Sequence, residues 1–413
     1  MPKRVVVTGM GCVTPFGNGW QKLWDNLIAG NSAVSEISSF DTSNFRTKIA
    51  AEIKNPDIDP LISKQIYRKF DRFSQFAAAA AKLALLDAGI DPECSGRKRF
   101  GVALGNGFGG INTALSQFET LQSRGTKRVS PFCIPMMLSS SAASNISMLF
   151  GLNGASETVS TACASSSDAI GLALEKIRSG EADLMLCGGS EAAVNPLIVA
   201  AFSSMRALSE KNETPQEACR PFDKERDGFV IGEGAAMLIL ESLESATARK
   251  ARIYAELAGY GAANDAFHLT QPEPDGLGLV NALKAALSDA GCRPEDVGCI
   301  NAHGTGTVAN DRVEAAAIRT VFGDFAGKIP VTANKPVTGH LLGAAGALEA
   351  VASVATLIKD EIPPVINLKN QDPECRLNLI ANTSKKAEIE TVVSESSGFG
   401  GHNSVLIFKK FKG

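Results

Sequence analysis

Cys163 is the first residue of this sequence that could carry chemistry. It lies among small residues directly before an apolar run, in TACASSSDAIGLALEKI. The run predicts a helix, whose N-terminus offers free backbone N–H groups and partial positive charge. Both lower the pKa of a thiol, and the small neighbours leave room for a substrate carbonyl. Cys163 is therefore a candidate nucleophile. The alternative is a small buried side chain, which is a common role of a free cysteine.

Two of the four histidines lie in turns rich in glycine and small residues, His303 in NAHGTGT and His340 in NKPVTGHLLGAAGA. Such turns let a ligand approach the backbone closely, so both rings are candidate catalytic groups. Lys335 precedes His340 by five residues. The alternatives are two structural histidines and a solvated surface lysine.

Neither glycine-rich turn predicts a nucleotide site. HGTGT lacks the pattern G-x-x-x-x-G-K-S/T of a phosphate loop. GNGFGG has the broad glycine spacing of a dinucleotide turn, but no acidic residue follows about 20 positions later at a strand end. Nucleotide binding is therefore discounted.

The elements that must position these groups alternate between short β-rich runs ending in glycine and helical stretches, which predicts an α/β fold. One repeat is visible: residues 87–93 read DAGIDPE and residues 289–295 read DAGCRPE, each after an Ala/Leu-rich helix. Upstream, RVVVTGMG and RIYAELAGYG match as first strands. We expect a duplicated fold with halves at 1–250, carrying Cys163, and 251–413, carrying the histidine pair and Lys335.

Each half also contains an unusually apolar helix. One follows Cys163, and the other is LLGAAGALEAVASVATLI. Helices without a polar face are buried, so these two are expected between two sheets. The predicted body is a five-layer α/β/α/β/α arrangement.

Bulk composition excludes several classes of protein. The 413 residues carry a net charge of −3, which argues against a global attraction to nucleic acid or acidic membrane. Nine cysteines without C-x-x-C spacing predict free thiols in a reducing compartment. The start, MPKRVVVTGMG, enters a strand at once and is unlike a signal peptide. The uncharged segment 129–156 is interrupted by prolines and too polar to span a membrane. These features predict a cytoplasmic protein.

Together, TACASSSDAIG, NAHGTGT, NKPVTGHLLGAAGALE and SGFGGHN resemble motifs of the β-ketoacyl-acyl carrier protein synthases, in that family's order and over essentially the whole chain. The nearest branch is the elongating synthase II of bacterial fatty acid synthesis. The resemblance implies a thiolase-like fold and a homodimer. It also implies decarboxylative Claisen condensation of malonyl-acyl carrier protein with an acyl group on Cys163, giving 3-oxoacyl-acyl carrier protein in chain elongation. Substrates would arrive on the phosphopantetheine of acyl carrier protein, with no further cofactor.

The resemblance also implies roles for individual residues. His303 and His340 would donate neutral N–H groups to the enolate oxygen, and Lys335 would orient them. Glu349 would pair with Lys335 or with a bound cation, because an unpaired buried acid is costly. The remaining implied residues are the oxyanion hole from the N–H groups of Cys163 and Phe399, a gate at Phe399 and Gly400, and substrate-binding residues Thr305, Thr307, Phe108, Phe202, Phe229 and His268. Thr305 and Thr307 would bind the pantetheine arm, or else only stabilise their turn.

Two departures from the family pattern stand out. Phe108 replaces the family's common aliphatic residue at the far end of the acyl pocket, which predicts a preference for short acyl primers. Glu395-Ser396-Ser397 replaces the family's Asn-Ser-Phe before the glycine turn, which puts a monovalent cation site and the packing of the gate in doubt. No metal is assigned.

An acidic carrier protein would need positive charge near the entrance of the site. The candidate basic residues are Lys64, Arg68, Lys69, Arg124, Lys127, Arg128 and Arg206. The alternative is that they are ordinary solvated charges. The uncharged segment 129–156 fits a dimer interface.

Three rival functions fit less well. A thiolase uses a second cysteine near its C-terminal glycine turn, where this chain has SGFGGHN. A Cys–His hydrolase needs one base and a path for water, whereas this set has two histidines and a lysine. A non-catalytic partner subunit would lack the nucleophile that Cys163 provides.

Overall fold

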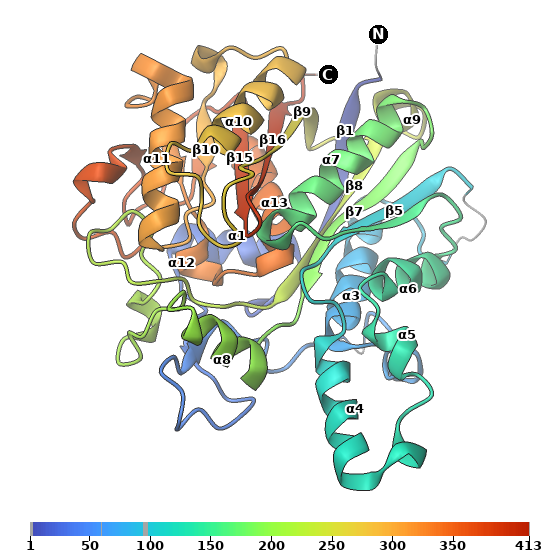
Figure 1. Ribbon diagram of the computed structural model, residues 1–413. Helices are drawn as coiled ribbons and strands as arrows, with labels where there is room; N and C mark the ends of the chain where they lie inside the picture. Colours follow the sequence, from blue (N-terminus) through green and yellow to red (C-terminus); the bar gives the residue numbers. More distant parts are fainter. Residues whose placement is uncertain (1–2, 59, 94–97, 413) are drawn as a thin grey trace.

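The two halves of the chain build sheets with the same strand order (Figure 1). The computed structural model describes residues 3–58, 60–93 and 98–412. In the first half the order is β6-β5-β7-β8-β1, and in the second it is β11-β10-β15-β16-β9. In both, the strand next to the inner edge, β8 or β16, runs antiparallel to its neighbours.

The strands of the two sheets have the following bounds: β1 Val5–Thr14, β5 Phe100–Gly105, β6 Ser156–Val159, β7 Leu184–Glu191, β8 Gly234–Ser242, β9 Ala255–Asn264, β10 Cys299–Asn301, β11 Pro330–Thr332, β15 Thr391–Gly398 and β16 His402–Lys410. Short strands complete the set: β2 Gly17–Asn18, β3 Ser35–Glu36, β4 Ile49–Ala50, β12 Glu361–Ile362, β13 Asn378–Leu379 and β14 Lys385–Lys386. The helices are α1 Trp20–Ala29, α2 Lys64–Tyr67, α3 Arg72–Asp87, α4 Ile111–Arg124, α5 Cys133–Met137, α6 Ser141–Phe150, α7 Ser165–Arg178, α8 Pro196–Ser204, α9 Leu243–Ala248, α10 Leu277–Asp289, α11 Val308–Phe322, α12 Lys335–Thr338 and α13 Ala345–Lys359.

The repeated sequence Asp-Ala-Gly makes the same contact twice. Asp87, at the end of α3, accepts the backbone N–H of Met10 in β1 at 2.8 Å. Asp289, at the end of α10, accepts the backbone N–H of Tyr260 in β9 at 2.9 Å. Each aspartate therefore ties the end of its helix to the first strand of its half, and the predicted duplication is confirmed. The boundary at residue 250 stays a prediction.

Glycines in the two first strands explain how close these helices lie. A Cβ atom on Gly9 would collide with the carbonyl oxygen of Ala84 in α3. A Cβ on Gly259 would collide in the same way with the carbonyl oxygen of Ala286 in α10. Because only glycine lets backbone approach backbone this closely, the matched strands RVVVTGMG and AELAGYG need glycine at this position.

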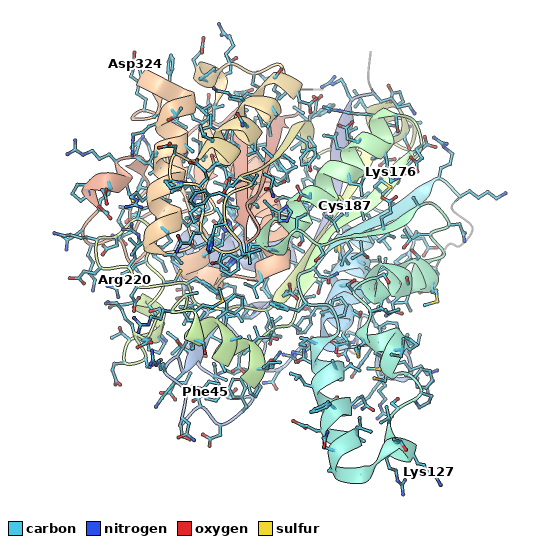
Figure 2. The ribbon with its side chains drawn as sticks, in the orientation of Figure 1. Phe45, Lys127, Lys176, Cys187, Arg220 and Asp324 are labelled. Carbon is cyan, nitrogen blue, oxygen red and sulfur yellow. The ribbon has the colours of Figure 1, made fainter. Side chains whose placement is uncertain are left out.

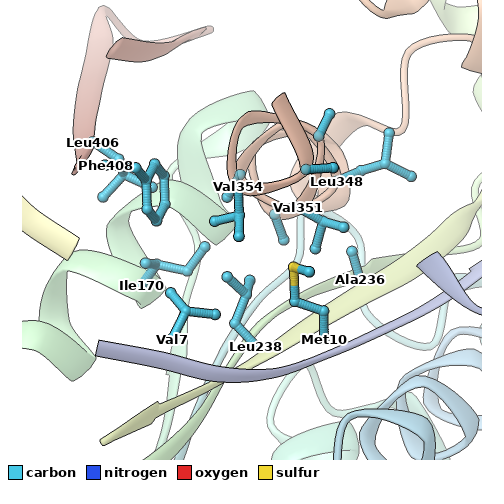
Figure 3. Packing of buried hydrophobic residues seen from close by; sticks show 14 of the residues in the cluster. Val7, Met10, Ile170, Ala236, Leu238, Leu348, Val351, Val354, Leu406 and Phe408 are labelled. Atoms are coloured by element: carbon cyan, nitrogen blue, oxygen red, sulfur yellow. The ribbon is translucent and has the colours of Figure 1, made fainter. Parts of the chain in front are cut away.

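The molecule has five layers, as the sequence predicts. Helices α3 and α6 cover the outer face of the first sheet, and α10 and α11 cover that of the second. Helices α7 and α13 lie between the sheets in the central core. Figure 3 shows side chains from β1, α7, β8, α13 and β16 meeting there, among them Val7, Ile170, Leu238, Val351, Val354 and Leu406.

The two sheets are not separate, which differs from the expectation. Strands β1 and β9 pair antiparallel at Val6–Glu256 and Val7–Ala255, so one continuous strand order crosses the molecule. The central helices cover this junction, because α13 contacts both β8 and β16.

One described segment, Leu342–Lys359, is apolar and long enough to cross a membrane by composition, and 89% of it is buried inside the protein. It contains α13, so core burial accounts for its apolar character.

The cysteines within the described ranges are all unpaired, as predicted, and Cys94 lies outside these ranges.

Candidate active site

Cys163, His303 and His340 converge on one pocket of about 380 Å³. They come from distant parts of the chain: the start of α7, the loop after β10, and the loop after α12. Both sheets deliver these segments to the same end of the central helix layer. The sequence-predicted residues that also line the pocket are Phe202, Phe229, Thr305, Thr307, Phe399 and Gly400.

Cys163 is held by a strained turn that the second half of the chain repeats. A short helical turn, Ala162–Ala164, leads into α7, and its first residue has a φ of 51°. The turn Leu342–Ala344 leads into α13 in the same way, and Leu342 also has a φ of 51°. A positive φ at a non-glycine residue is rare and points to a functional constraint. In the second half, Gly343 occupies the position that corresponds to Cys163 in the first half. Only the turn of the first half therefore presents a nucleophile.

The Cys163 sulfur lies 3.2 Å from Nε2 of His340 and accepts the backbone N–H of Phe399. Burial raises the pKa of the Cys163 thiol to about 12, although the positive charge of Lys335 acts in the opposite direction. The expectation of an acidified thiol is therefore wrong, because loss of hydration outweighs the groups that favour the thiolate.

The hydrogen-bond partners of the two rings decide which nitrogen carries the hydrogen. The backbone N–H of Leu342 donates to Nδ1 of His340 at 3.3 Å. The ammonium of Lys335 donates to Nδ1 of His303 at 3.2 Å. A neutral imidazole whose Nδ1 accepts must carry its hydrogen on Nε2. Each ring therefore presents an N–H donor at Nε2.

Both rings are neutral at ordinary pH. Burial, followed by the charge of Lys335, lowers the pKa of His303 and that of His340 well below the usual value of histidine. The ring centres lie 5.3 Å apart in an edge-to-face arrangement. The pocket thus holds two neutral N–H donors, one of them in contact with the sulfur, and this is the geometry that stabilises a developing oxyanion.

Lys335 is almost fully buried at the start of α12 and makes three contacts. Besides Nδ1 of His303, its ammonium contacts the carbonyl oxygen of His303 and the carboxylate of Glu349. Lys335, one of the two partners that the sequence allowed for Glu349, therefore pairs with its Oε1, while its Oε2 has no hydrogen-bond partner within the described residues. Burial raises the pKa of Glu349 to about 7 against the attraction of Lys335.

Sequence reasoning missed two buried acids that hold the loop of His303. Glu314 on α11 accepts the backbone N–H groups of His303 at 2.5 Å and Gly304 at 2.9 Å. Asp311, one turn earlier, accepts the N–H of Gly306 at 3.2 Å. The signal was available: two acids at helical spacing follow NAHGTGT, and both are buried.

Comparison with known proteins places this arrangement in a family. The family model described as "Beta-ketoacyl synthase, N-terminal domain" matches residues 2–246, and "Beta-ketoacyl synthase, C-terminal domain" matches residues 254–369. The chain belongs to the β-ketoacyl synthase family.

Relatives and solved structures cover the whole of this β-ketoacyl synthase. It is 45% identical to the 3-oxoacyl-(acyl-carrier-protein) synthase 2 of Synechocystis and 43% identical to that of Staphylococcus aureus, with 99% of each chain covered. Among solved structures, the ishigamide ketosynthase/chain length factor has a TM-score of 0.94 at 36% identity and full coverage of both chains. A β-ketoacyl synthase from Burkholderia phymatum has a TM-score of 0.92 at 36% identity, covering 99% and 100% of the two chains.

Aromatic rings form one wall of the synthase pocket. Phe202 packs against Phe229 at 5.2 Å and against Phe399 at 6.3 Å between ring centres. Phe229 in turn packs edge-on against His340 at 5.2 Å. This wall continues outward to Phe108, whose ring centre lies 6.3 Å from that of Phe202.

Two residues predicted to bind substrate do not line the pocket. Phe108 lies behind Phe202 and is 38% exposed. His268 is exposed, and its Nδ1 accepts the backbone N–H groups of Thr270 and Gln271 at 3.1 and 3.2 Å. Thr270 and Gln271 line the pocket. His268 is therefore connected to the site through the hydrogen bonds that it accepts from these two residues.

Proposed function

We propose that this chain condenses malonyl-acyl carrier protein with an acyl group held on Cys163, releasing carbon dioxide and forming 3-oxoacyl-acyl carrier protein in fatty acid elongation. The observation that carries the proposal is one sulfur facing two neutral imidazole N–H groups in a single pocket. The 3-oxoacyl-(acyl-carrier-protein) synthase 2 names of relatives that match along the whole chain support it.

The first step loads the acyl group. The Cys163 sulfur attacks the thioester carbonyl, the new C–S bond forms, and the bond to the pantetheine sulfur breaks. The proton of the Cys163 thiol leaves with the pantetheine thiol, so charge balances. The backbone N–H groups of Cys163 and Phe399 receive the oxyanion, which fits the contact of the Phe399 N–H with the sulfur.

The second step forms the carbon–carbon bond. The malonyl group loses carbon dioxide, and its electron pair becomes an enolate whose oxygen accepts the Nε2–H groups of His303 and His340. The enolate carbon attacks the acyl carbonyl on Cys163. The C–S bond breaks, the released Cys163 thiolate takes up one proton from solvent, and the 3-oxoacyl product stays on the carrier. Burial and the charge of Lys335 keep both rings neutral, and Lys335 holds the tautomer of His303.

Phe399 and Gly400 are the proposed gate. Phe399 lies between the nucleophile and Phe202, and Gly400 and Gly401 have φ angles of 82° and 77°, which favour glycine. Two adjacent glycines with positive φ angles permit a loop movement that residues with a Cβ atom would restrict. Thr305 and Thr307 share a hydrogen bond of 2.9 Å at the pocket wall, where their hydroxyls face an incoming pantetheine arm.

The proposed macromolecular partner is acyl carrier protein. One solved structure, 37% identical to this chain with a TM-score of 0.90, is of a type II PKS acyl-carrier protein in complex with its ketosynthase. In this chain, Arg206 is exposed at the pocket rim. Lys127 lies at the tip of the extension formed by α4 (Figure 2). Within the described residues, none of the seven candidate basic side chains forms an ion pair with an acid.

We propose a homodimer built on α4, α5 and the outer surface of α6. Helix α4 projects from the body (Figure 1), and this region exposes large apolar side chains, with Met148 73% and Ile134 61% exposed. Exposed apolar patches of this kind mark protein interfaces. The further exposed members are Phe118, Phe132 and Leu138. Sedimentation of the purified chain should give twice the monomer mass, and a monomer at micromolar concentration would contradict the assignment.

The proposed reaction needs no cofactor beyond the carrier's phosphopantetheine, no metal, no nucleic acid and no membrane. The proposed location is the cytoplasm, where free thiols persist.

A condensation assay with acyl- and malonyl-carrier protein tests the function. Wild type should form 3-oxoacyl product and show a mass increase on Cys163 after acyl-carrier protein alone. Cys163→Ser should lose the mass increase and about a thousandfold or more of the activity. His303→Ala should keep the mass increase and lose condensation. A Cys163→Ser protein that condenses at the wild-type rate would refute the proposal.

A further inference from the structure

A fully buried acid that the proposed mechanism does not use lies at the end of β7. Glu191 is 0% exposed, and its carboxylate accepts three backbone N–H groups. Oε2 accepts the N–H of Gly107 at 2.7 Å and that of Gly343 at 3.1 Å. Oε1 accepts the N–H of Phe108 at 3.2 Å. Burial raises the pKa of Glu191 to about 7, and these donors act in the opposite direction. One buried carboxylate therefore joins a turn from each half of the chain.

The turn in the first half is GNGFGG, residues 105–110, for which the sequence gives no ligand. Its glycines bring it against the starts of both central helices. A Cβ atom on Gly105 would lie 2.3 Å from the backbone of Ser165, the first residue of α7. A Cβ on Gly343, in the turn that leads into α13, would lie 2.4 Å from the backbone nitrogen of Gly107. Because only glycine allows such an approach, the motif is a junction where the backbones of the two halves meet.

The contact with Phe108 fixes the backbone that carries one ring of the aromatic wall. Phe108 donates its N–H to Oε1 of Glu191, and its ring centre lies 6.3 Å from that of Phe202. Phe202 lines the pocket that holds Cys163. A backbone N–H bound to a buried carboxylate forms a strong, charge-assisted hydrogen bond. The position of the Phe108 ring therefore depends on Glu191.

The contact with Gly343 fixes the turn that orients His340. Leu342, directly before Gly343, has a φ of 51° and donates its N–H to Nδ1 of His340 at 3.3 Å. A positive φ at leucine persists only where the surrounding contacts hold it. The hydrogen bond from Gly343 to Glu191 is such a contact. Its loss frees the N–H that holds the tautomer of His340.

We propose that Glu191 is a positioning residue that couples the aromatic wall of the acyl pocket to His340. One carboxylate then sets both the space for the acyl group and the orientation of the ring that donates to the enolate oxygen. The catalytic consequences rest on the proposed function, whereas the coupling of the two turns does not. A substitution at Glu191 should therefore change two properties at once that belong to separate parts of the pocket.

Hydrogen exchange followed by peptide mass spectrometry tests the coupling without catalysis. Glu191→Met keeps the length of the side chain and removes both acceptor oxygens. Peptides that cover residues 106–109 and residues 342–344 should therefore both exchange about tenfold faster or more than in wild type. If only one of the two segments exchanges faster, or neither does, the proposal is overturned.

Glu241→Met is the matched control for general destabilisation. Glu241 is also 0% exposed, and on β8 it pairs with Leu184 at the start of β7, whereas Glu191 is at the end of that strand. Its carboxylate accepts side-chain donors of Arg249 and Ser245 at 2.7 Å each. This variant should lose stability, because Arg249 loses its acid. It should leave hydrogen exchange in the two turns and the catalytic properties as in wild type.

Wild type alone provides a second measurement, should Glu191→Met not fold. Residues 106–109 and 342–344 should exchange as slowly as the neighbouring strand β7, because their N–H groups donate to a buried acceptor. Exchange at the rate of an exposed loop in either segment would show that Glu191 does not hold it, and the proposal would fail.

The kinetic test separates a positioning role from a merely structural one. Glu191→Met should lower malonyl decarboxylation about tenfold to a hundredfold, because the ring of His340 is misplaced. It should also raise kcat/KM for long primers relative to short ones about tenfold, because Phe108 loses its anchor. Phe108→Ala should change only the primer preference.

Two results of the kinetic test contradict the coupling. One is a Glu191→Met protein that is less stable but unchanged in both kinetic properties. The other is a variant in which only one of the two properties changes. A wild-type protein without condensation activity would instead refute the proposed function, and hydrogen exchange would then decide on Glu191.

Discussion

Nε2 of His340 lies 3.2 Å from the sulfur of Cys163, while the backbone N–H of Leu342 donates to the opposite nitrogen of the same ring. The ring therefore faces the nucleophile as a hydrogen-bond donor and not as a base. A thiol placed this way exchanges its proton with the incoming pantetheine sulfur, and the same ring N–H is then free to serve the enolate oxygen.

The pH dependence of thiol alkylation tests this view. Because burial raises the pKa of Cys163 to about 12, the thiolate fraction should increase about tenfold per pH unit from neutral pH upward, without a plateau near pH 9. The rate of iodoacetamide labelling of Cys163, followed by peptide mass spectrometry, measures it. A plateau at or below about pH 8.5 would show an acidified thiol instead.

Substitution of the two histidines should separate their contributions. His303→Ala and His340→Ala should each lower malonyl decarboxylation by about a hundredfold to a thousandfold, because each removes one donor from the oxyanion. Only His340→Ala should also change the alkylation rate of Cys163, since only His340 contacts the sulfur. If Cys163 is alkylated at the same rate in both variants, the contact of His340 with the sulfur does not affect the thiol, and the prediction is wrong.

The buried pair of Lys335 and Glu349 predicts a pH-dependent loss of stability. Lys335→Met leaves Glu349 buried without its cation, which should cost about 3–5 kcal/mol near pH 8. Glu349 already has a raised pKa, and loss of Lys335 raises it further, so at low pH the carboxyl protonates and the cost shrinks. Denaturant unfolding at two pH values measures this.

The double variant Lys335→Met/Glu349→Gln is the control for that experiment. It removes both charges, so it should regain most of the stability but none of the activity, because Nδ1 of His303 still lacks its donor. If Lys335→Met is equally stable at low and high pH, protonation of the unpaired Glu349 does not reduce the cost of the substitution, and the prediction is wrong.

Phe108 should limit the length of the acyl primer. Its ring supports Phe202, which lines the pocket, so Phe108→Ala should let Phe202 move and raise kcat/KM for long primers more than for short ones. Phe325→Ala removes a ring of similar exposure, 37% against 38%, away from the pocket and is the matched control. Wild-type activity that does not decline with primer length would contradict the role of Phe108.

Carrier-protein docking should depend on the basic tip of the extension. Reversing the charges of Lys127 and Arg128 to Glu should raise the carrier-protein KM severalfold and leave kcat unchanged, because neither side chain lines the pocket that holds Cys163. The effect should weaken at high salt. An unchanged KM would remove these two residues from the docking surface.

The sequence predicted the layers of the fold because its signals are local. An apolar helix with no polar face has to be buried, and the repeated Asp-Ala-Gly marks the same helix end in both halves. It did not predict that β1 and β9 join the two sheets, because pairing between edge strands depends on how the halves dock. Glu314 was missed although it follows NAHGTGT at helical spacing from Asp311, because that spacing does not show which backbone N–H groups the two acids meet.

The sequence by itself determined which chemical groups this protein brings together: one thiol at a helix start, two imidazoles in glycine turns and a lysine nearby. Only the tertiary structure decided how they act. The pKa of the thiol depends on burial, and the contact between Cys163 and His340 joins segments 177 residues apart. The tautomer of His303 depends on Lys335, which lies 32 residues further along the chain. Such contacts are made by packing of the two halves, and no local pattern encodes them.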